Sequence, residues 1–138
     1  MSHYVRCNTV FRDRESLVHA LTELGWSREQ IEDHEEATPL YGYQGDLRLE
    51  TAHVIIRRRH IGGLSNDLGF ARQEDGTYAA IISEYDRDSL GYDAAWLGRL
   101  RQSYAAEQIR KQCAQRRIPL QREVKDGRII LRLQPVRR

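Results

Sequence analysis

The chain has few cysteines, no long apolar run and no recognisable catalytic motif, and each absence excludes a class of protein. Its two cysteines, Cys7 and Cys113, lie far apart and outside any Cys-x-x-Cys pattern. We therefore expect two reduced structural thiols in core positions and a cytoplasmic location. No apolar stretch approaches the roughly 18 residues that a membrane-spanning helix needs. The N-terminus has neither the basic segment nor the apolar run of a secretory signal, so we expect no membrane partner.

Motifs for catalysis and for phosphate or metal binding are also missing. No Ser or Cys stands in a Gly-x-Ser-x-Gly turn, and no Gly-x-x-x-x-Gly-Lys or Gly-x-Gly-x-x-Gly loop is present. His53 and His60 are seven residues apart, which is not the i, i+4 spacing of a helical zinc site. The sequence therefore predicts no catalytic residue, no cofactor and no metal. An enzyme that uses Tyr41, Tyr43 and His53 is a minor alternative.

The net charge of +2 conceals a charge gradient along the chain. Residues 1–56 carry five basic and ten acidic side chains, whereas residues 110–138 carry ten basic and two acidic ones. A basic end can attract phosphates or an acidic protein surface, although it can equally be a solvated strand face with a loose tail. The length of 138 residues, with 40% hydrophobic and 30% charged side chains, predicts a single domain over residues 1–138.

Two Asp-Gly pairs are the strongest fold signal. Both residues of a two-residue type I′ turn need positive φ, which Asp tolerates and Gly adopts freely. The first pair, Asp75-Gly76, predicts a hairpin of residues 67–73 with residues 77–85, in which Phe70 lies opposite Ile81. Because both faces of this hairpin are apolar, we expect it at the centre of a sheet.

The second pair, Asp126-Gly127, predicts a hairpin of residues 120–125 with residues 128–134. Hydrophobic and polar residues alternate cleanly along both of its strands. The apolar side chains that we expect to face the core are Leu120, Val124, Ile129, Leu131 and Leu133.

Two helices are indicated between these strands. Asp13 is a candidate N-cap for a helix with an apolar face that ends at Gly25, and Asp93 is a candidate N-cap for a helix over residues 94–116. Further strands are expected at residues 4–11 and 51–59. Together these elements predict a single two-layer α+β domain, with two helices packed on a mostly antiparallel sheet.

Three segments read as connections rather than as regular structure. Residues 31–38 contain four carboxylates around His34, without the Gly-punctuated spacing of a calcium loop, and we expect an exposed acidic linker. Residues 61–66 are expected to form a flexible loop, and residues 86–91 a polar connection.

Aromatic and basic side chains give the best candidates for a partner-binding surface. Tyrosine rings can stack on a base or anchor a protein partner, or they can simply cap the core. Tyr41 and the arginines at the end of the strand over residues 51–59 lie at opposite ends of the sheet, unless Tyr41 belongs to a strand antiparallel to it. The candidate partner-binding residues are Tyr41, Tyr43, Arg57, Arg58, Arg59, Arg128 and Arg132.

Several short strings also occur in a recognisable order. These are Gly42-Tyr43-Gln44-Gly45, a strand ending in Ile55-Ile56-Arg57-Arg58, then Asp67-Leu68-Gly69-Phe70, Asp75-Gly76-Thr77-Tyr78, and Asp126-Gly127 followed by Ile129 and Leu131. In that order they resemble the cyanobacterial and plastid family named "hypothetical chloroplast reading frame thirty-five", a domain of unknown function. The resemblance covers nearly the whole chain. The chain departs from the family at residues 58–66 and 86–92.

The resemblance implies an accessory protein, because members of this family are often encoded near an AAA+ ATPase and other small proteins. It supplies no catalytic residues. We therefore expect a non-enzymatic accessory or adaptor protein that docks on a protein partner, for which an AAA+ ATPase system is implied. The alternative is a nucleic-acid-binding module that uses the basic C-terminal end. The sequence does not predict the oligomeric state.

Overall fold

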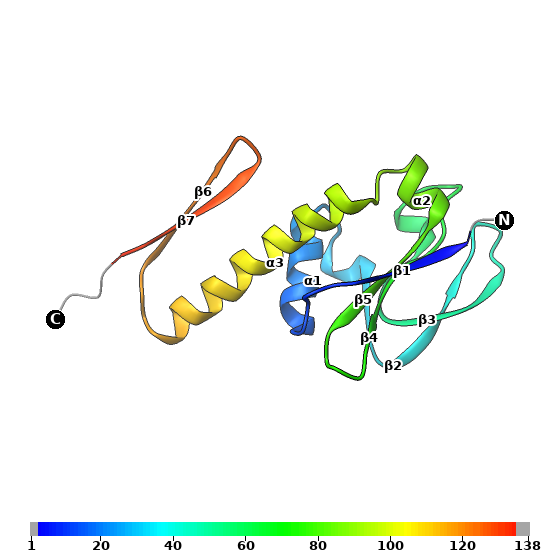
Figure 1. Ribbon diagram of the computed structural model, residues 1–138, viewed down its shortest axis with the longest axis horizontal. Helices are drawn as coiled ribbons and strands as arrows, with labels where there is room; N and C mark the ends of the chain where they lie inside the picture. Colours follow the sequence, from blue (N-terminus) through cyan, green and yellow to red (C-terminus); the bar gives the residue numbers. More distant parts are fainter. Residues whose placement is uncertain (1–2, 135–138) are drawn as a thin grey trace.

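The computed structural model describes residues 3–134 (Figure 1). Its strands are β1 (Tyr4–Asn8), β2 (Ile31–Tyr41), β3 (Leu47–Ile56), β4 (Leu68–Arg72), β5 (Tyr78–Ser83), β6 (Leu120–Lys125) and β7 (Arg128–Leu133). Its helices are α1 (Arg14–Glu23), α2 (Glu84–Ser89) and α3 (Ala94–Gln115), with single 3₁₀ turns η1 (Arg28–Gln30) and η2 (Arg58–His60). Strands β1 to β5 form one antiparallel sheet in the order β1-β5-β4-β3-β2, and β6 and β7 form a separate two-stranded sheet. The predicted α+β class is therefore confirmed.

The main core lies between the five-stranded sheet and the helices α1 and α3. The ring of Phe11 lies 4.8 Å from the ring of Tyr104 and 6.3 Å from that of Phe70, measured between centroids. The Tyr104 hydroxyl accepts the backbone N–H groups of Arg12 and Asp13, at 3.0 and 2.9 Å. The connection from β1 into α1 is therefore held directly by α3.

The hairpin of β2 and β3 belongs to the sheet, but the part of it that contains Leu40 and Ala52 bends over the second face and covers it. Leu40 and Ala52 of this hairpin are fully buried in a cluster with residues of β4 and β5. The pairing of β2 with β3 shifts register twice, and such bulges bend a hairpin. Gly69 permits the close approach, because a Cβ at this position would lie 2.6 Å from the Cβ of Ala52. The sheet therefore buries apolar side chains on both faces.

Residues 31–38 are not the acidic linker that the sequence predicts, because they belong to β2. β2 is an edge strand, so its carboxylates can project into solvent while Ile31 and Leu40 point into the two cores. Asp33 also pairs with Arg14, at 2.9 Å. Charged side chains on an edge strand discourage pairing with a second molecule.

The predicted register of the central hairpin is wrong by one residue. Phe70 lies opposite Ala80, and Gly69 opposite Ile81. The turn has three residues rather than two, because the N–H of Gly76 donates to the carbonyl of Gln73, and only Gly76 has positive φ. This is a type I turn followed by a left-handed glycine, the commonest three-residue hairpin loop. The predicted central position is confirmed, since β4 and β5 are flanked by β3 and β1.

The second Asp-Gly pair forms the predicted two-residue turn. Asp126 and Gly127 both have positive φ, at 52° and 73°, and Val124 lies opposite Ile129. The strands are predicted almost to the residue. Their apolar face is not buried as expected, since Val124 is 69% exposed and Leu133 is 53% exposed.

Other expectations need correction. Residues 84–89 form the helix α2 within the predicted strand end and polar connection, because Ser83 caps the helix by accepting the N–H of Asp86 at 3.0 Å. The strand predicted over residues 51–59 ends at Ile56. Cys7 is exposed, whereas Cys113 is buried as predicted, and both are free thiols. Cys7 lacks cover because β1 is the other edge of the sheet.

The two long helices agree with the sequence in position but not in every detail. Asp93 caps α3 by accepting the N–H of Trp96, at 3.1 Å. Asp13 occupies the N-cap position of α1 without a side-chain cap, because its carboxylate binds Lys111 and Gln108 of α3 instead. Among residues 3–134, no helix is long and apolar enough to cross a membrane.

Candidate functional site

Arg57 joins two strands and the segment before β4. Its guanidinium donates to both carboxylate oxygens of Glu32, each at 2.9 Å, and to Oδ2 of Asp67 at 2.7 Å. It also lies over the ring of Tyr41, 5.6 Å from the centroid. These hydrogen bonds from Arg57, followed by those from His34, hold the pKa of the Glu32 carboxyl below its ordinary range.

The structure therefore brings Tyr41 and Arg57 together, although they lie at opposite ends of the β2–β3 pairing. The bend of the hairpin over the sheet closes this distance, and Tyr41 and Asp67 exchange two hydrogen bonds there, at 2.8 and 2.9 Å. The side chain of Arg57 is only 14% exposed, and its Nε, Nη1 and Nη2 atoms all donate to oxygens of Glu32, Pro39 and Asp67. Arg57 fastens the fold and has little surface to offer a partner.

The segment before β4 is an irregular loop, as predicted, and hydrogen bonds hold it to its surroundings. Arg58 donates through Nε to the carbonyl of Ser65 and through Nη2 to that of Gly63, at 3.1 and 2.8 Å. Asn66 accepts the N–H of Tyr43 at 3.0 Å and donates to Ser83 at 2.9 Å. Of the three neighbouring arginines, Arg59 is the exposed one, and its Nε donates to the imidazole of His60 at 3.2 Å.

Asp86 lies beneath this segment and is fully buried. Its Oδ2 accepts the N–H of Asn66 at 3.2 Å, while its Oδ1 is the one buried polar side-chain atom without a hydrogen-bond partner in the described part of the chain. Burial raises the pKa of this carboxyl from 3.8 to about 6.

The structure does not bring Tyr41, Tyr43 and His53 into the hydrogen-bonded arrangement that the minor enzymatic alternative requires. His53 accepts the N–H of Arg72 through Nδ1, at 3.0 Å, and burial together with nearby arginines lowers its pKa. Within residues 3–134 it makes no hydrogen bond to Tyr41 or Tyr43. The same residues contain no group of three or more His, Cys, Asp or Glu side chains placed to hold a metal ion.

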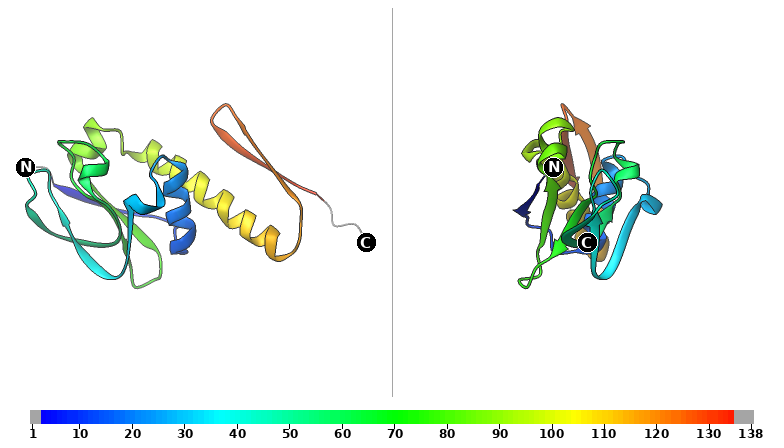
Figure 2. Two further views of the ribbon diagram at one scale, coloured as in Figure 1. Left: turned by 180° about the vertical axis from the view of Figure 1, so that it is seen from behind. Right: turned by 90° about the vertical axis from the view of Figure 1, so that its right-hand side faces the viewer.

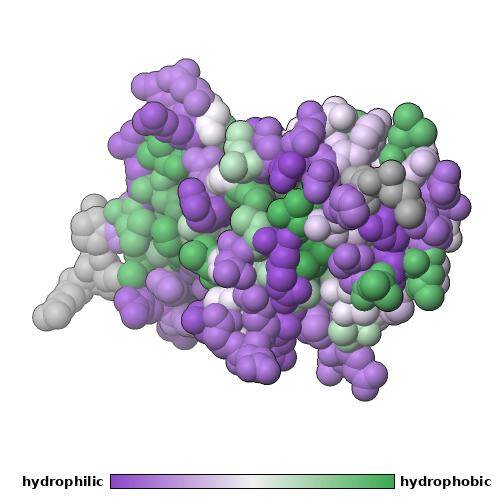
Figure 3. Space-filling view, turned by 45° about the vertical axis from the view of Figure 1, so that its right-hand side comes forward, coloured by the Kyte–Doolittle hydropathy of each residue, from purple (hydrophilic) through white to green (hydrophobic). Residues whose placement is uncertain are grey.

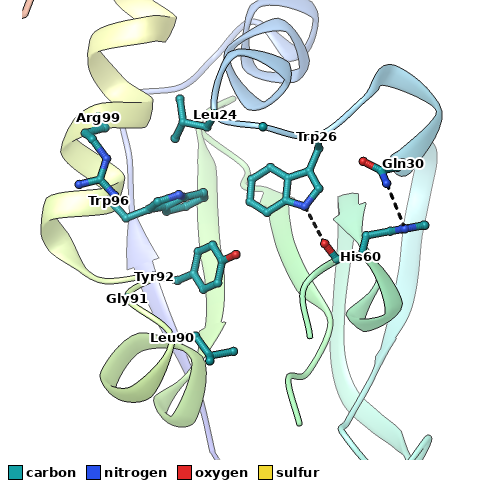
Figure 4. A pocket seen from close by; sticks show the side chains of 10 residues that line it. Leu24, Trp26, Gln30, His60, Leu90, Gly91, Tyr92, Trp96 and Arg99 are labelled. Carbon is teal, nitrogen blue, oxygen red and sulfur yellow. Dashed lines mark hydrogen bonds between the residues drawn. The ribbon is translucent and has the colours of Figure 1, made fainter. Parts of the chain in front are cut away.

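An aromatic pocket, which the sequence reasoning did not identify, opens where α3 begins (Figure 4). It has a volume of about 490 Å³ and is walled by Trp26, Tyr92 and Trp96. The Tyr92 and Trp96 rings meet edge to face with centroids 5.1 Å apart, and Trp26 lies 6.0 Å from each. The sequence did contain a signal for this pocket, because Trp26 and Trp96 are the chain's two tryptophans and each follows a helix boundary. Arg99, Gln30 and His60 lie at its rim.

The hairpin of β6 and β7, called the C-terminal hairpin below, extends away from the sheet beyond α3 (Figures 1 and 2). Gln102 holds its turn by accepting the N–H of Ile129 at 2.9 Å and donating to the carbonyl of Gly127 at 3.3 Å. An ion pair joins Arg122 to Glu23 of α1. The apolar face appears as a green strip at the left of Figure 3. Its apolar members are Leu120, Val124, Ile129, Leu131 and Leu133, and Arg122 lies among them, opposite Leu131.

The predicted basic residues of this hairpin lie on its opposite face. According to the strand register, Arg128 and Arg132 share that face with Gln121, Glu123, Lys125 and Ile130. Both arginines are exposed, and Arg132 pairs with Glu123 at 3.2 Å. The candidate residues therefore fall into two groups, one around the β2–β3 hairpin and one on the C-terminal hairpin.

Comparison with known proteins places the chain in a family. The model of a family described as "Protein of unknown function (DUF1257)" matches residues 20–132. No curated protein and no solved structure matches the chain.

Proposed function

We propose that this chain, which belongs to the DUF1257 family of proteins of unknown function, is a non-enzymatic accessory protein that docks on a protein partner through its C-terminal hairpin. The observation that carries the proposal is the exposed apolar face of this hairpin. Val124 and Leu133 are more than half exposed, whereas Leu120, Ile129 and Leu131 are more than half covered by the rest of the protein. An isolated two-stranded hairpin is at best marginally stable in water. A partner that covers this face would supply the missing burial.

The charges around the hairpin favour an acidic partner. Residues 110–138 carry ten basic and two acidic side chains, so an approaching acidic surface is attracted over a distance of about 8–10 Å at physiological ionic strength. Apolar centres with charged rims are the common arrangement of protein interfaces. The occupant that we propose is therefore a protein surface with an apolar strip bordered by carboxylates.

The identity of this partner is a finer proposal. The resemblance to the "hypothetical chloroplast reading frame thirty-five" family supports an AAA+ ATPase system as the partner, and a cytoplasmic location goes with it. Neither the fold nor the family match depends on this assignment.

Affinity purification from the native host, followed by measurement of ATPase content, tests the proposal. Val124→Asp and Leu133→Asp should abolish co-purification of an AAA+ ATPase without lowering the melting temperature, since both side chains are exposed. Leu49→Asp is the matched control, because Leu49 is an exposed leucine of β3, outside the C-terminal hairpin. Co-purification that survives both hairpin substitutions would contradict docking at this face.

The opposite face of the hairpin supports a second candidate, nucleic-acid binding. Lys125, Arg128 and Arg132 project together there and could neutralise successive phosphates. Arg128→Gln with Arg132→Gln should then release nuclease-sensitive material from the purified protein, whereas Val124→Asp should not. The two candidates therefore differ in which face of the hairpin is sensitive to substitution.

A further inference from the structure

Most of the hydrogen-bonding groups at the rim of the aromatic pocket that have no partner are donors. The Arg99 guanidinium makes no hydrogen bond or ion pair with any residue that the structure describes. The Trp96 indole N–H likewise has no hydrogen-bond partner among the described residues. It is not one of the buried side-chain atoms that lack a partner, so it remains accessible. The Tyr92 hydroxyl remains protonated, because burial and the nearby Asp86 charge raise its pKa. Three donors are therefore available to a ligand.

The acceptors at the same rim are already used. The carbonyl of His60 accepts the indole N–H of Trp26 at 3.0 Å (Figure 4). Oε1 of Gln30 accepts the backbone N–H of Ser27 at 3.0 Å. In the His60 ring, Nε2 accepts from Nε of Arg59 at 3.2 Å, and Nδ1 lies 3.5 Å from the side-chain amide of Gln30. No Asp or Glu lines the pocket. The positive charge of Arg99 is therefore not neutralised locally.

The apolar part of the pocket wall is held in place. Trp26 and Trp96 are 8% and 5% exposed and belong to the main core, so their positions are fixed by packing. Leu24 and Leu90 complete the wall, with Leu90 below Tyr92 in Figure 4. A volume of about 490 Å³ lies within the usual range of small-ligand sites, roughly 300–1,000 Å³.

We propose that this pocket binds a carboxylate that carries an aromatic or apolar group, with the carboxylate on Arg99 and Trp96 and the apolar group against Leu24 and Tyr92. A guanidinium is suited to this role because it donates two parallel hydrogen bonds to one carboxylate. The same chemistry is offered by a free aromatic acid and by the C-terminal residue of a peptide. The inference is independent of the function proposed for the C-terminal hairpin.

Tryptophan fluorescence of the full chain tests this inference, because both tryptophans of the protein line the pocket. We expect 3-phenylpropionate to change the emission with a saturable dependence on concentration. The uncharged 3-phenylpropionamide should bind about tenfold or more weakly, since it lacks the charge that Arg99 recognises. The dipeptides acetyl-Gly-Phe and acetyl-Gly-Phe-amide form the second pair of probes. Binding of the dipeptide acid alone identifies a peptide C-terminus, and binding of 3-phenylpropionate identifies a free acid.

Arg99→Gln should weaken binding of the acid by about tenfold, with an unchanged melting temperature, because Arg99 is exposed and makes no bond within the described chain. Arg101→Gln is the matched control, as an exposed arginine of α3 that does not line this pocket, and it should bind as the wild type does. The proposal is overturned if neither acid gives a saturable change, if the amides bind as well as the acids, or if Arg99→Gln binds like the wild type.

Discussion

Asp86 carries the least favourable charge in the described part of the protein. It is fully buried, its Oδ1 has no partner, and burial raises its pKa from 3.8 to about 6. A carboxyl with a raised pKa in the folded state binds its proton more tightly there than in the unfolded chain. The resulting stabilisation is fully present below about pH 4 and is lost as the pH rises through about 6.

Asp86→Asn should therefore raise the free energy of unfolding at pH 7.5, by about 3 kcal/mol for a shift of this size. The amide oxygen can still accept the N–H of Asn66, so the local geometry is retained. Urea unfolding at pH 7.5 and pH 4.5 measures the effect, and the gain should shrink at the lower pH, where the wild-type carboxyl is largely protonated. Asp88→Asn, an exposed neighbour in α2, should change neither value. A destabilised Asp86→Asn protein at pH 7.5 would refute this account.

Arg57 is the opposite case, a charge whose partners depend on it. Arg57→Gln leaves Asp67, which is 1% exposed, and Glu32 without their shared cation. Removing one member of a buried ion pair costs about 3 kcal/mol or more, and Arg57→Lys should recover little, because lysine cannot make the two-pronged contact with Glu32. Chemical denaturation at pH 7 measures the loss. The exposed Arg59→Gln should have no comparable effect, and similar behaviour of the two variants would show that Arg57 is only a surface residue.

At the scale of elements, the sequence was sufficient where the signal is local. Asp93 caps α3 as predicted, and Asp126-Gly127 makes the predicted turn. Both depend on residues adjacent in the chain. The first hairpin was found but misregistered, because Asp-Gly is compatible with two- and three-residue loops, which differ by one residue in pairing.

The predictions failed where distant residues decide the structure. β2 is a strand in spite of its carboxylates because Arg14 of α1 and Arg57 after β3 pair with Asp33 and Glu32, while Glu35 and Glu36 are exposed to solvent at the sheet edge. The aromatic pocket joins three separate segments, so no single window of sequence reveals it. Tyr41 and Arg57 were correctly considered together, but their contact depends on the bend of a hairpin that the sequence does not specify.

The packing of that hairpin on the sheet depends on Gly69. In Gly69→Ala, the new Cβ would lie 2.6 Å from the Cβ of Ala52 and 3.2 Å from Leu40, so the two layers must separate. Overpacking of this kind costs about 1–3 kcal/mol. Gly62→Ala is the control, because no atom lies within 4 Å of its added Cβ. Thermal unfolding should show a lower melting temperature for Gly69→Ala alone, and equal melting temperatures would mean that the hairpin does not pack this closely.

The described part of the molecule consists of a body, residues 3–117, and the C-terminal hairpin. The body contains the five-stranded sheet with both apolar clusters, whereas the hairpin contacts it through Gln102, the Arg122–Glu23 ion pair and partly buried side chains. These polar contacts are exposed or partly exposed, and each contributes little to stability. The body should therefore fold without the hairpin, and the hairpin should serve another purpose.

A chain that ends at Arg117 tests this division. We expect it to unfold cooperatively, with a free energy of unfolding lower by only about 1–2 kcal/mol, because few hydrogen bonds and little apolar burial are lost. Its tryptophan emission should match that of the full chain, since Trp26 and Trp96 lie in the body, whereas it should no longer retain the partner that Val124→Asp also loses. Urea unfolding followed by fluorescence and by circular dichroism measures the free energy of unfolding and the tryptophan emission. Affinity purification measures whether the partner is retained. If the shortened chain is unfolded, the hairpin is needed for folding of the body. The argument that the hairpin is dispensable for stability and therefore serves a partner would then be wrong.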